Sequence, residues 1–584
     1  MEKSEKKEKG SGFSNGKPSF VYICQQDDLK SVLEALDNSS VVAVDLETTG
    51  LDPRKDRIRL VSLQTEEELW VIDAFAVDIT PLFDVLSKAT IVGHNLKFDL
   101  QFLMQSDFQP GLVACTMVMS QLFHGPRQDK GFHSLADTLW REVGVEISKD
   151  EKTSDWASPE LSDQQLEYAA NDVAHLLWLY DALKRQIDAT KQEKALEIEM
   201  RCLPSVAWMG LHGVGFDRDA WIDLANEAKA EAKEIVEALD REAPTYSQGN
   251  LFGSSGWNWS SSKQVCEVFQ LLGIEVTSSN DRALAAIDHP LATLLRQYRN
   301  AKKRETTYGT DWLSHVDPDV RVYASWVQLA ADTGRMSCRS PNLQQLPRDS
   351  RYRECFVAPP GRTFVVADYS QIELRIAAKI AKEEMMIEAY KAGEDLHRKT
   401  AQLLLGKDDI SKDDRQLAKS ANFGLLFGMG VEGYREFAFT NYGVQLTQEE
   451  AKEYRDAFFQ AYPALRKWHR RVGRTNKQAI ETRTISGRSR AGVTRFTEKL
   501  NSPVQGTGAD GLKRALALLW QRWKECPGAF PVLAVHDEIV VECAVEQADV
   551  VKQWLEKAMV DGMQPLIDPV PVVVEGKISR TWIK

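Results

Sequence analysis

The sequence lacks the features that mark several protein classes. No apolar stretch approaches the ~20 residues that a helix needs to cross a bilayer, so we do not expect a membrane protein. The eight cysteines are scattered, with no CxxC pair and no nearby group of histidines, which argues against a zinc site and favours a reducing compartment. Residues 1–19 mix Lys with Glu, unlike a signal or transit peptide, and we predict a disordered tail there.

An excess of basic residues is missing as well. The formal net charge is −12, which by itself argues against a nucleic-acid partner, because a polyanion is attracted to a basic surface. The argument is weak, since metal-binding carboxylates lower the total while a local basic patch can still bind phosphates. Internal repeats and low-complexity linkers are also absent, and 584 residues predict three or four domains.

Patterns of apolar residues divide the chain into three parts. Residues 20–190 alternate between strand-like and helix-like segments, which predicts a mixed sheet flanked by helices. Residues 191–320 are mostly long amphipathic helical patterns, with a basic tract from Arg296 to Arg304 that could be a solvated face. From residue 321 on, short apolar strands frame a helical block at about 380–480.

Acidic residues interrupt an apolar strand near the N-terminus. Asp45 and Glu47 stand two apart in VVAVDLE, so both side chains point to one face of a strand and can share a metal ion. Asp99 follows a second strand-like segment, and Tyr168 and Asp172 stand four apart on a predicted helix. Four carboxylates and a phenol suit two divalent cations that activate water for attack on a phosphodiester. Any one of these acids alone is more typical of a solvated surface.

A second group of acids lies in the C-terminal half. Asp368 ends the apolar strand FVVAD, and Glu373 follows shortly after. His536, Asp537 and Glu538 separate two apolar runs as a hairpin turn would. Because a buried carboxylate without a partner is costly, we expect metal ions carrying a nucleoside triphosphate at these acids.

A helical segment between these acids carries two cations and an aromatic ring. Arg415, Lys419 and Phe423 recur every four residues and so form one stripe of a helix. Such cations can bind phosphates while the ring stacks on a base or sugar. A solvated charged face is the alternative for this segment taken alone.

The N-terminal acids resemble the three motifs of the DEDD exonuclease superfamily, in its tyrosine-containing subclass. The matching residues are Asp45 and Glu47, then Asn95, Phe98 and Asp99, then Tyr168 and Asp172. The resemblance implies a 3′→5′ proofreading exonuclease in which the four acids hold metal ions and Tyr168 orients the attacking water. Cys115 stands where relatives commonly have Asp, but that position is not a metal ligand, so we expect activity to survive.

The three C-terminal segments resemble, in order, motifs A, B and C of the family A (DNA polymerase I-like) DNA polymerases. The resemblance implies a multidomain α/β protein: an RNase H-like exonuclease domain with a mixed sheet and helices, then a right-hand polymerase with an antiparallel palm sheet, helical fingers and a helical thumb. The predicted domains are 20–190 exonuclease, 191–320 mainly thumb, 321–384 first palm part, 385–490 fingers and 491–584 second palm part.

The family resemblance also implies roles for individual residues. Metal ions, two Mg²⁺ per site with Mn²⁺ as a substitute, are expected at Asp368, Tyr369 and Asp537, with Glu538 in support. Lys419 is expected to protonate the leaving pyrophosphate. Nucleotide-binding residues are expected to be Arg415, Lys419, Phe423, His397, Glu373, Gln371 and Phe427, with Arg415, Lys419 and His397 neutralising phosphates. DNA contacts are expected from Arg335, Asn342, Gln505, His536, Lys303 and Arg304.

Two aromatic residues depart from the usual family pattern. Phe427 replaces a tyrosine that hydrogen-bonds to the glutamate here numbered Glu373, which excludes the ribose 2′-hydroxyl. We therefore predict a more loosely held Glu373 and relaxed ribonucleotide exclusion. Phe423, also in place of Tyr, implies poor use of dideoxynucleotides.

Two other functions compete with this reading. An exonuclease whose C-terminal half only binds DNA would show erosion of Asp368, Asp537, Arg415 or Lys419, and none is eroded. A non-catalytic DNA-binding scaffold would not need two intact sets of acids and would be more basic. We expect a monomer that acts on primer-template DNA and dNTPs without a membrane, in the cytoplasm of a bacterium or phage-infected cell, with an organelle as the alternative. The chain leaves no room for a 5′ nuclease, and whether it is a complete phage-like enzyme or a fragment stays open.

Overall fold

The computed structural model describes residues 13–14, 17–126, 129, 131–147, 154–244, 256–475 and 477–583. These residues form two compact units. The first contains the chain up to His212, Ala324–Arg339 and Val365–Ile578, and the second contains Gly213–Tyr323, Ser340–Phe364 and the segment from Ser579 on. Among the described helices, none is long and apolar enough to cross a membrane.

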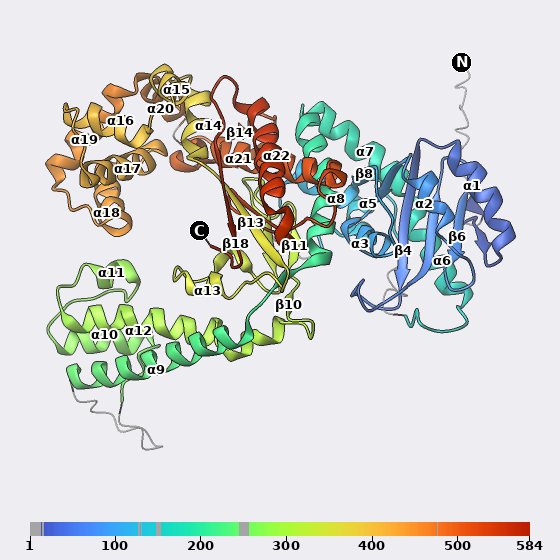
Figure 1. The fold of residues 1–584 in the computed structure, drawn as a ribbon, viewed down its shortest axis with the longest axis horizontal. Helices are drawn as coiled ribbons and strands as arrows, with labels where there is room; N and C mark the ends of the chain where they lie inside the picture. Colours follow the sequence, from blue (N-terminus) through green and yellow to red (C-terminus); the bar gives the residue numbers. More distant parts are fainter. Residues whose placement is uncertain are drawn as a thin grey trace, which may run out of the picture. The chain divides into compact units, whose positions relative to one another are not determined.

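A six-stranded mixed sheet forms the N-terminal part of the first unit (Figure 1). Its order is β3-β6-β5-β4-β7-β8, with β4 antiparallel to β5 and parallel to β7. The strands are β3 Val21–Ile23, β4 Val41–Thr48, β5 Ile58–Gln64, β6 Leu69–Asp73, β7 Thr90–Gly93 and β8 Leu112–Cys115. The short strands β1 Phe13–Ser14 and β2 Lys17–Pro18 form a separate pair. The predicted mixed sheet is confirmed.

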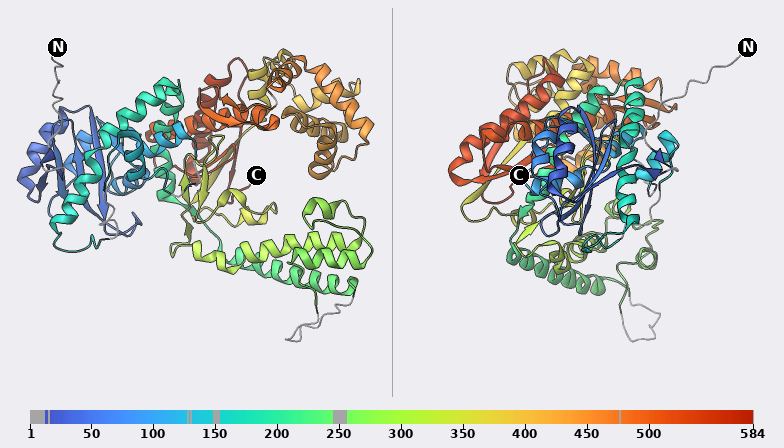
Figure 2. Two further views of the ribbon diagram at one scale, coloured as in Figure 1. Left: turned by 180° about the vertical axis from the view of Figure 1, so that it is seen from behind. Right: turned by 90° about the vertical axis from the view of Figure 1, so that its right-hand side faces the viewer.

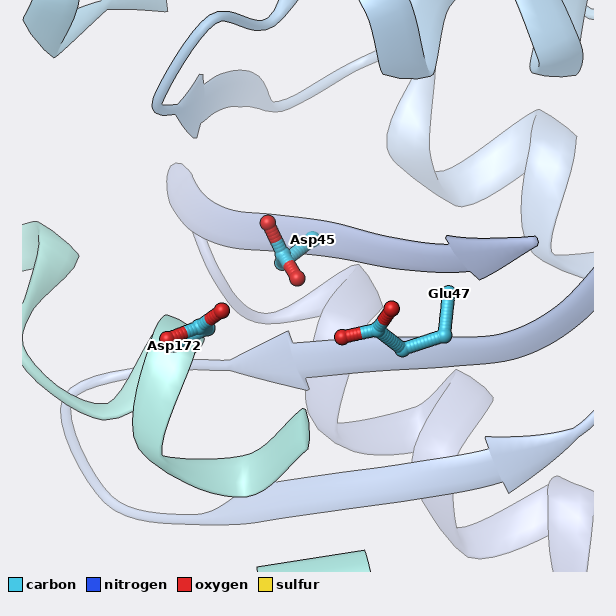
Figure 3. A group of neighbouring side chains, drawn as sticks. All are labelled: Asp45, Glu47 and Asp172. Atoms are coloured by element: carbon cyan, nitrogen blue, oxygen red, sulfur yellow. The ribbon is translucent and has the colours of Figure 1, made fainter. Parts of the chain in front are cut away.

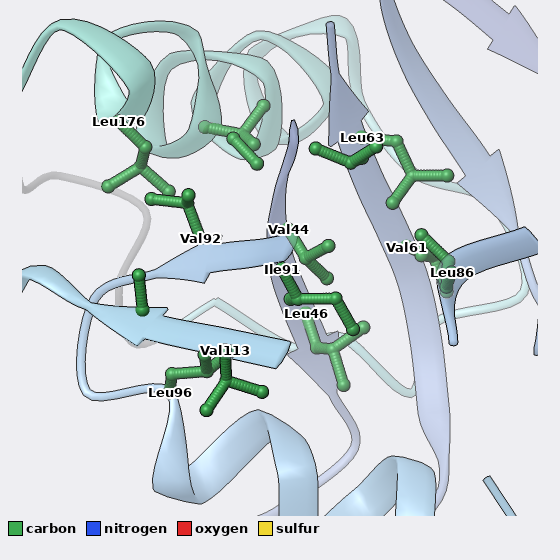
Figure 4. Close-up of a cluster of buried hydrophobic side chains, with 14 of the residues drawn as sticks. Val44, Leu46, Val61, Leu63, Leu86, Ile91, Val92, Leu96, Val113 and Leu176 are labelled. Carbon is green, nitrogen blue, oxygen red and sulfur yellow. The ribbon is translucent and has the colours of Figure 1, made fainter. Parts of the chain in front are cut away.

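Helices cover both faces of this sheet. Figure 4 shows Leu176 of α7 packed on one side of the strands and Leu96, just before α3, on the other. The central strands carry β-branched and Leu side chains that are fully buried, such as Val44 and Ile91, which is the composition expected of strands covered on two faces. The helices are α1 Leu29–Asp37, α2 Pro81–Leu86, α3 Lys97–Gln105, α4 Thr116–His124, α5 Leu135–Val143, α6 Asp163–Ala174 and α7 Leu176–Ala189.

Helix α8, Glu193–His212, is buried along most of its length. It packs against α3 and β8 of the N-terminal sheet region and also against α21 and β16 of the second sheet. Apolar side chains of α8 lie all around its axis, as expected of a helix that is covered on all sides. The structure therefore groups α8 with the first unit, whereas the predicted thumb, 191–320, includes it.

A second sheet, of order β16-β17-β13-β18, lies in the C-terminal half. Its strands are β13 Arg362–Tyr369, β16 Phe530–Val535, β17 Glu538–Ala544 and β18 Val574–Ser579. The helices α14 Ile372–Ala381, α21 Phe496–Gln521 and α22 Ala548–Ile567 pack together beside it. Two further small antiparallel pairs of the first unit are β11 Ser325–Val327 with β12 Ser337–Arg339 and β14 Ile480–Arg483 with β15 Ser489–Val493.

A block of helices follows α14, at the position that the sequence predicted. These are α15 Glu384–Lys391, α16 Leu396–Leu405, α17 Lys412–Leu426, α18 Val431–Tyr442, α19 Gln448–Ala461 and α20 Pro463–Gly473. Ser411 and Asp414 form a capping box that fixes the start of α17, and such reciprocal hydrogen bonds satisfy the free N–H groups of a helix start. The capped helix carries Arg415, Lys419 and Phe423.

The second unit is built on two long helices, α9 Arg218–Glu242 and α12 Pro290–Thr307, which pack side by side (Figure 1). Figure 2 shows the same pair, in green, from behind. Its other elements are α10 Ser262–Leu271, α11 Asp281–Ala285, α13 Arg351–Glu354, β9 Val214–Gly215 and β10 Arg321–Val322. The unit has its own core, with Trp257, Trp259 and Phe269 buried in it.

Candidate active sites

Three acids converge on one face of the N-terminal sheet. Asp45 and Glu47 lie on β4, and Asp172 lies on α6, which packs against β4. Ser162 and Gln165 form a capping box at the start of α6 and so fix its first turn. Ligand atoms of the three acids lie within 4.8 Å of one another (Figure 3). Local spacing in the sequence does not reveal this cluster, because Asp172 comes from a segment far from Asp45 and Glu47.

Burial and mutual repulsion shift the titration of these acids. Burial, followed by the charges of Asp172 and Asp99, raises the pKa of Glu47 to about 9. Burial, then Asp99, Asp172 and Glu47, raises the pKa of Asp45 well above its usual value. Acids so placed hold protons unless a cation compensates them. Oxygen ligands at this spacing fit hard divalent cations, so the residues present fit the metal ions that the family resemblance implies.

Asp99 lies close to the three acids but makes a different contact. It is on α3, is 3% exposed, and its Oδ1 accepts a 3.1 Å hydrogen bond from the backbone N–H of Leu46. Burial raises the pKa of Asp99 to about 8, while this hydrogen bond opposes the shift. Asp99 is thus anchored to β4 between Asp45 and Glu47 and is outside the group of three within 4.8 Å.

Two hydroxyls face the same region. Burial and a hydrogen bond to Asp172 raise the pKa of Tyr168, which is therefore a neutral phenol. Ser62 lies directly across the strand pair from Asp45, and its buried hydroxyl has no hydrogen-bond partner among the described residues. A buried polar atom of this kind needs water or a ligand, which is further support for a polar occupant of this site. Sequence reasoning did not single out Ser62.

In the second sheet, the register of two neighbouring strands brings Asp368 beside Asp537. Asp368 is the last residue but one of β13, and the backbone N–H of the last, Tyr369, donates a 3.2 Å hydrogen bond to the carbonyl of Asp537. Asp537 occupies the turn between β16 and β17, and Glu538 begins β17 and is buried. His536, in the same turn, is exposed and has φ of 60°. The hairpin predicted from the sequence is present.

The Tyr369 side chain is buried and hydrogen-bonded within the protein. It is 2% exposed, and its hydroxyl donates a 2.8 Å hydrogen bond to the carbonyl of Met559 on α22. Burial and the charge of Asp537 raise the pKa of the Tyr369 phenol. Only its backbone is thus positioned to serve at the metal site that the sequence predicted.

Glu373 is held by two groups that sequence reasoning assigned to DNA. Arg335 Nη2 donates to Glu373 Oε1 at 2.7 Å, and Gln505 also hydrogen-bonds to this carboxylate. Burial raises the pKa of Glu373 and Arg335 opposes the shift. Because these two donors fix the carboxylate, we now expect Glu373 to be held in place without a hydroxyl at position 427.

The cationic stripe of α17 is tied to α16. Asp395 caps α16 by accepting from the backbone N–H groups of His397 and Arg398 and also pairs with Arg415 at 2.7 Å. His397 is 2% exposed and lies 2.8 Å from Asn422. Burial lowers the pKa of His397 to about 4, so it is neutral at pH 7. The phosphate contact predicted for His397 stays a prediction, in which the histidine acts as a neutral hydrogen-bonding group.

The remaining predicted residues lie at several places. Lys419 lies 5.9 Å from the ring of Tyr442, Phe423 lies 5.7 Å from His397, and Phe427 caps α17. Gln371 has φ of 55°, and its Oε1 accepts from Tyr390. Lys303, Arg304 and Asn342 belong to the second unit. There Arg304 pairs with Glu231, and Asn342 caps a 3-10 turn at Leu343–Gln345.

A buried network of four charges was not foreseen. Glu199 on α8 accepts from Lys513 (2.6 Å) and Arg488, and Arg488 also donates to Asp510 at 2.6 Å. Each residue is at most 4% exposed. Gln328 donates to the second oxygen of Glu199. The network has two positive and two negative members and links α8 to α21 and to the loop before β15. No spacing rule in the sequence connects these residues.

Comparison with known proteins finds a family match for each part of the chain. A family model described as "DNA polymerase family A" matches residues 223–584, and one described as "3'-5' exonuclease" matches residues 20–188. The chain belongs to DNA polymerase family A. This polymerase is 37% identical to the DNA polymerase I of Aquifex aeolicus, over 97% of the chain and 100% of that relative. It is 29% identical to the DNA polymerase I of Pseudomonas aeruginosa, of which it covers 66%.

Solved structures agree on the fold of the polymerase. It matches a structure titled "POL domain of Pol1 from M. smegmatis complex with DNA primer-template and dNTP" with a TM-score of 0.80 and 22% identity, over 96% of the chain and 99% of that domain. The predicted family and fold class are confirmed, as is the assignment as a DNA-directed DNA polymerase with a 3′→5′ exonuclease domain. Members of these families use divalent metals, and the cluster of Asp45, Glu47 and Asp172 is consistent with that use.

Proposed function

We propose that the chain extends a DNA primer at Asp368 and Asp537 and removes mispaired 3′ ends at Asp45, Glu47, Asp99 and Asp172, with two Mg²⁺ ions at each site. The proposal rests on one observation: acids from distant segments meet at two separate places in the first unit. When bound, the ions would lower the pKa of the attacking oxygen and neutralise charge on the phosphate. Mn²⁺ is expected to substitute for Mg²⁺.

At the exonuclease site, the protein supplies ligands and orientation. Asp45, Glu47 and Asp172 hold the cations, and the 3.1 Å bond from Leu46 fixes Asp99 beside them. Tyr168, kept neutral by its surroundings, donates or accepts a hydrogen bond that orients the attacking water. A frayed, mispaired primer end reaches this site more readily than a paired one.

At the polymerase site, Lys419 and Arg415 bind the triphosphate. Lys419 protonates the departing pyrophosphate, which is general acid catalysis by a positioned cation. Arg415 reaches the phosphates by sharing or leaving its ion pair with Asp395. His397 contributes a neutral hydrogen bond. Closure of α17 over a correct base pair would couple the shape of the pair to catalysis.

We also propose that the polymerase acts as a monomer on primer-template DNA and dNTPs. Arg335 and Gln505 contact the primer-template near Glu373, and Glu373 excludes the ribose 2′-hydroxyl. Lys303, in the second unit, contacts the DNA backbone. Its side chain is exposed, which leaves it accessible to a phosphate.

Primer extension with Mg²⁺ and dNTPs on a defined template tests the assignment. Asp368→Ala should abolish extension and retain primer shortening, whereas Asp45→Ala should abolish shortening and retain extension. Asp84→Asn, which changes an exposed acid on α2, is the control and should retain both activities. Loss of both activities in either alanine variant at an unchanged melting temperature would contradict two independent sites.

A further inference from the structure

Helix α20 carries a row of cations that the proposed reaction does not use. Arg466, Lys467, Arg470, Arg471 and Arg474, here called the basic face of α20, are all exposed. At about 100° per residue they lie within an arc of about 140°. No acid occurs between Pro463 and Arg474, and none of the five cations has an ion-pair partner among the described residues.

This arrangement destabilises the helix that carries it. Arg466 and Arg470, Lys467 and Arg471, and Arg470 and Arg474 are like charges four residues apart, which repel on a helix. The helix dipole favours cations only in the last turn, so it opposes Arg466 in the first. A merely solvated face would not need to concentrate one sign of charge in a chain of net charge −12.

The basic tract of the second unit is different in this respect, because three of its five cations have an ion-pair partner. Arg296 pairs with Asp281, Lys302 with Glu305 and Arg304 with Glu231. Such partners compete with phosphate, because a cation already paired must lose its acid or share it. Because its cations have no ion-pair partner among the described residues, the basic face of α20 is the stronger anion-binding surface of the two.

The opposite face of α20 is anchored to the polymerase site. His469 Nε2 donates a 2.9 Å hydrogen bond to the carbonyl of Leu426, the last residue of α17. α20 also packs against α14, which carries Glu373, and α21, which carries Gln505 (Figure 1). Glu383 accepts from the backbone N–H groups of Ala464 and Leu465, so the helix start already has its anion. An anionic ligand that approaches α20 would therefore contact the side chains of its basic face and not the backbone N–H groups at its start.

We propose that the basic face of α20 binds the phosphate backbone of the DNA substrate, as a contact surface separate from Arg335, Gln505 and the second unit. The inference rests on the proposed polymerase function, because it takes its ligand from that reaction. The bound segment is either unpaired template or duplex, which present the same phosphodiester chemistry. Holding it would raise DNA affinity without reading sequence.

Fluorescence anisotropy with labelled DNA tests this proposal. The variant K467E/R471E changes two cations, and K30E/K194E changes two exposed lysines on α1 and α8 by the same total charge. A third variant, Lys467→Arg with Arg471→Lys, keeps the charges. Each is measured on a primer-template with a 5′ single-stranded overhang and on a blunt duplex, from 50 to 200 mM KCl, with melting temperature as the folding check.

We expect K467E/R471E to weaken binding by about 10- to 50-fold at 0.1 M salt and to reduce the slope of log Kd against log salt by about 1.4 to 1.8. The other two variants should bind like the wild type. Weakening confined to the overhang substrate identifies unpaired template as the ligand, and equal weakening on both substrates identifies duplex. Equal affinity of K467E/R471E and K30E/K194E would overturn the proposal, whereas a wild-type protein that binds neither DNA would instead overturn the proposed function.

Discussion

Replacing Asp45 by Asn should stabilise the metal-free protein. Two unit charges 4.8 Å apart repel by about 3 kcal/mol at an effective dielectric constant of about 20. Asp45 has two such neighbours, Glu47 and Asp172, but their raised pKa values mean that protons already relieve part of the repulsion. We therefore expect a gain of about 1–3 kcal/mol at pH 8, or about 2–6 °C in the melting temperature of a unit of this size.

The pH dependence follows from the direction of the pKa shifts. The native state holds a proton on Glu47 up to a pH of about 9, whereas the unfolded state releases it near 4.5. Stability from this site is therefore greatest below pH 4.5 and is lost as the pH rises toward 9. The benefit of Asp45→Asn should be small at pH 5 and should grow at pH 8.

Calorimetry in EDTA, at pH 5 and at pH 8, measures this effect. Glu66→Gln, which neutralises an exposed acid in the turn between β5 and β6, is the matched control and should shift neither transition. Adding Mg²⁺ at pH 8 should stabilise the wild type more than Asp45→Asn. The difference between their melting temperatures should therefore shrink or change sign. An Asp45→Asn protein that melts at or below the wild-type temperature in EDTA at pH 8 would refute the reasoning.

Three further predictions concern the polymerase part. Phe427→Tyr should change discrimination between dNTPs and rNTPs less than about three-fold in single-nucleotide insertion kinetics, because Arg335 and Gln505 already hold Glu373; a ten-fold change would show that the 427 hydroxyl matters. His397→Gln should leave the shape of the kcat/KM pH profile between pH 6 and 8 unchanged, since burial lowers the pKa of His397 to about 4, and a lost inflection in that range would contradict a neutral histidine. Arg488→Met should destabilise the first unit by about 3–5 kcal/mol, because it leaves buried charges without their partner; a melting temperature within 1 °C of the wild type would contradict that role, and exposed Arg218→Met is the control.

The sequence predicted those features that depend on local pattern. The strand ending at Asp45 and Glu47, the helix bearing Tyr168 and Asp172, and the hairpin around Asp537 follow from alternation, four-residue spacing and a break between apolar runs. Each is fixed by neighbours in the chain, so it can be read without knowledge of the fold. Which acids would meet came from the family resemblance, since spacing alone does not pair Asp45 with Asp172.

Features that depend on tertiary packing escaped prediction. The charge state of His397 is set by burial between α16 and α17, and the support of Glu373 comes from Arg335 and Gln505, which lie far away in the chain. The network of Glu199, Arg488, Asp510 and Lys513 joins three segments that no periodicity connects. That no described acid pairs with the basic face of α20 likewise becomes visible only once neighbouring helices are in place.

The burial of α8 from both sides limits how this polymerase can be divided. A cut near residue 190 would strip away α3 and β8 and leave apolar side chains such as Leu196 and Leu203, now 7% and 1% exposed, open to water. A fragment made in this way would tend to aggregate unless its new surface were redesigned. Point substitution is thus the sounder route to a proofreading-deficient form, because it leaves the shared helix covered.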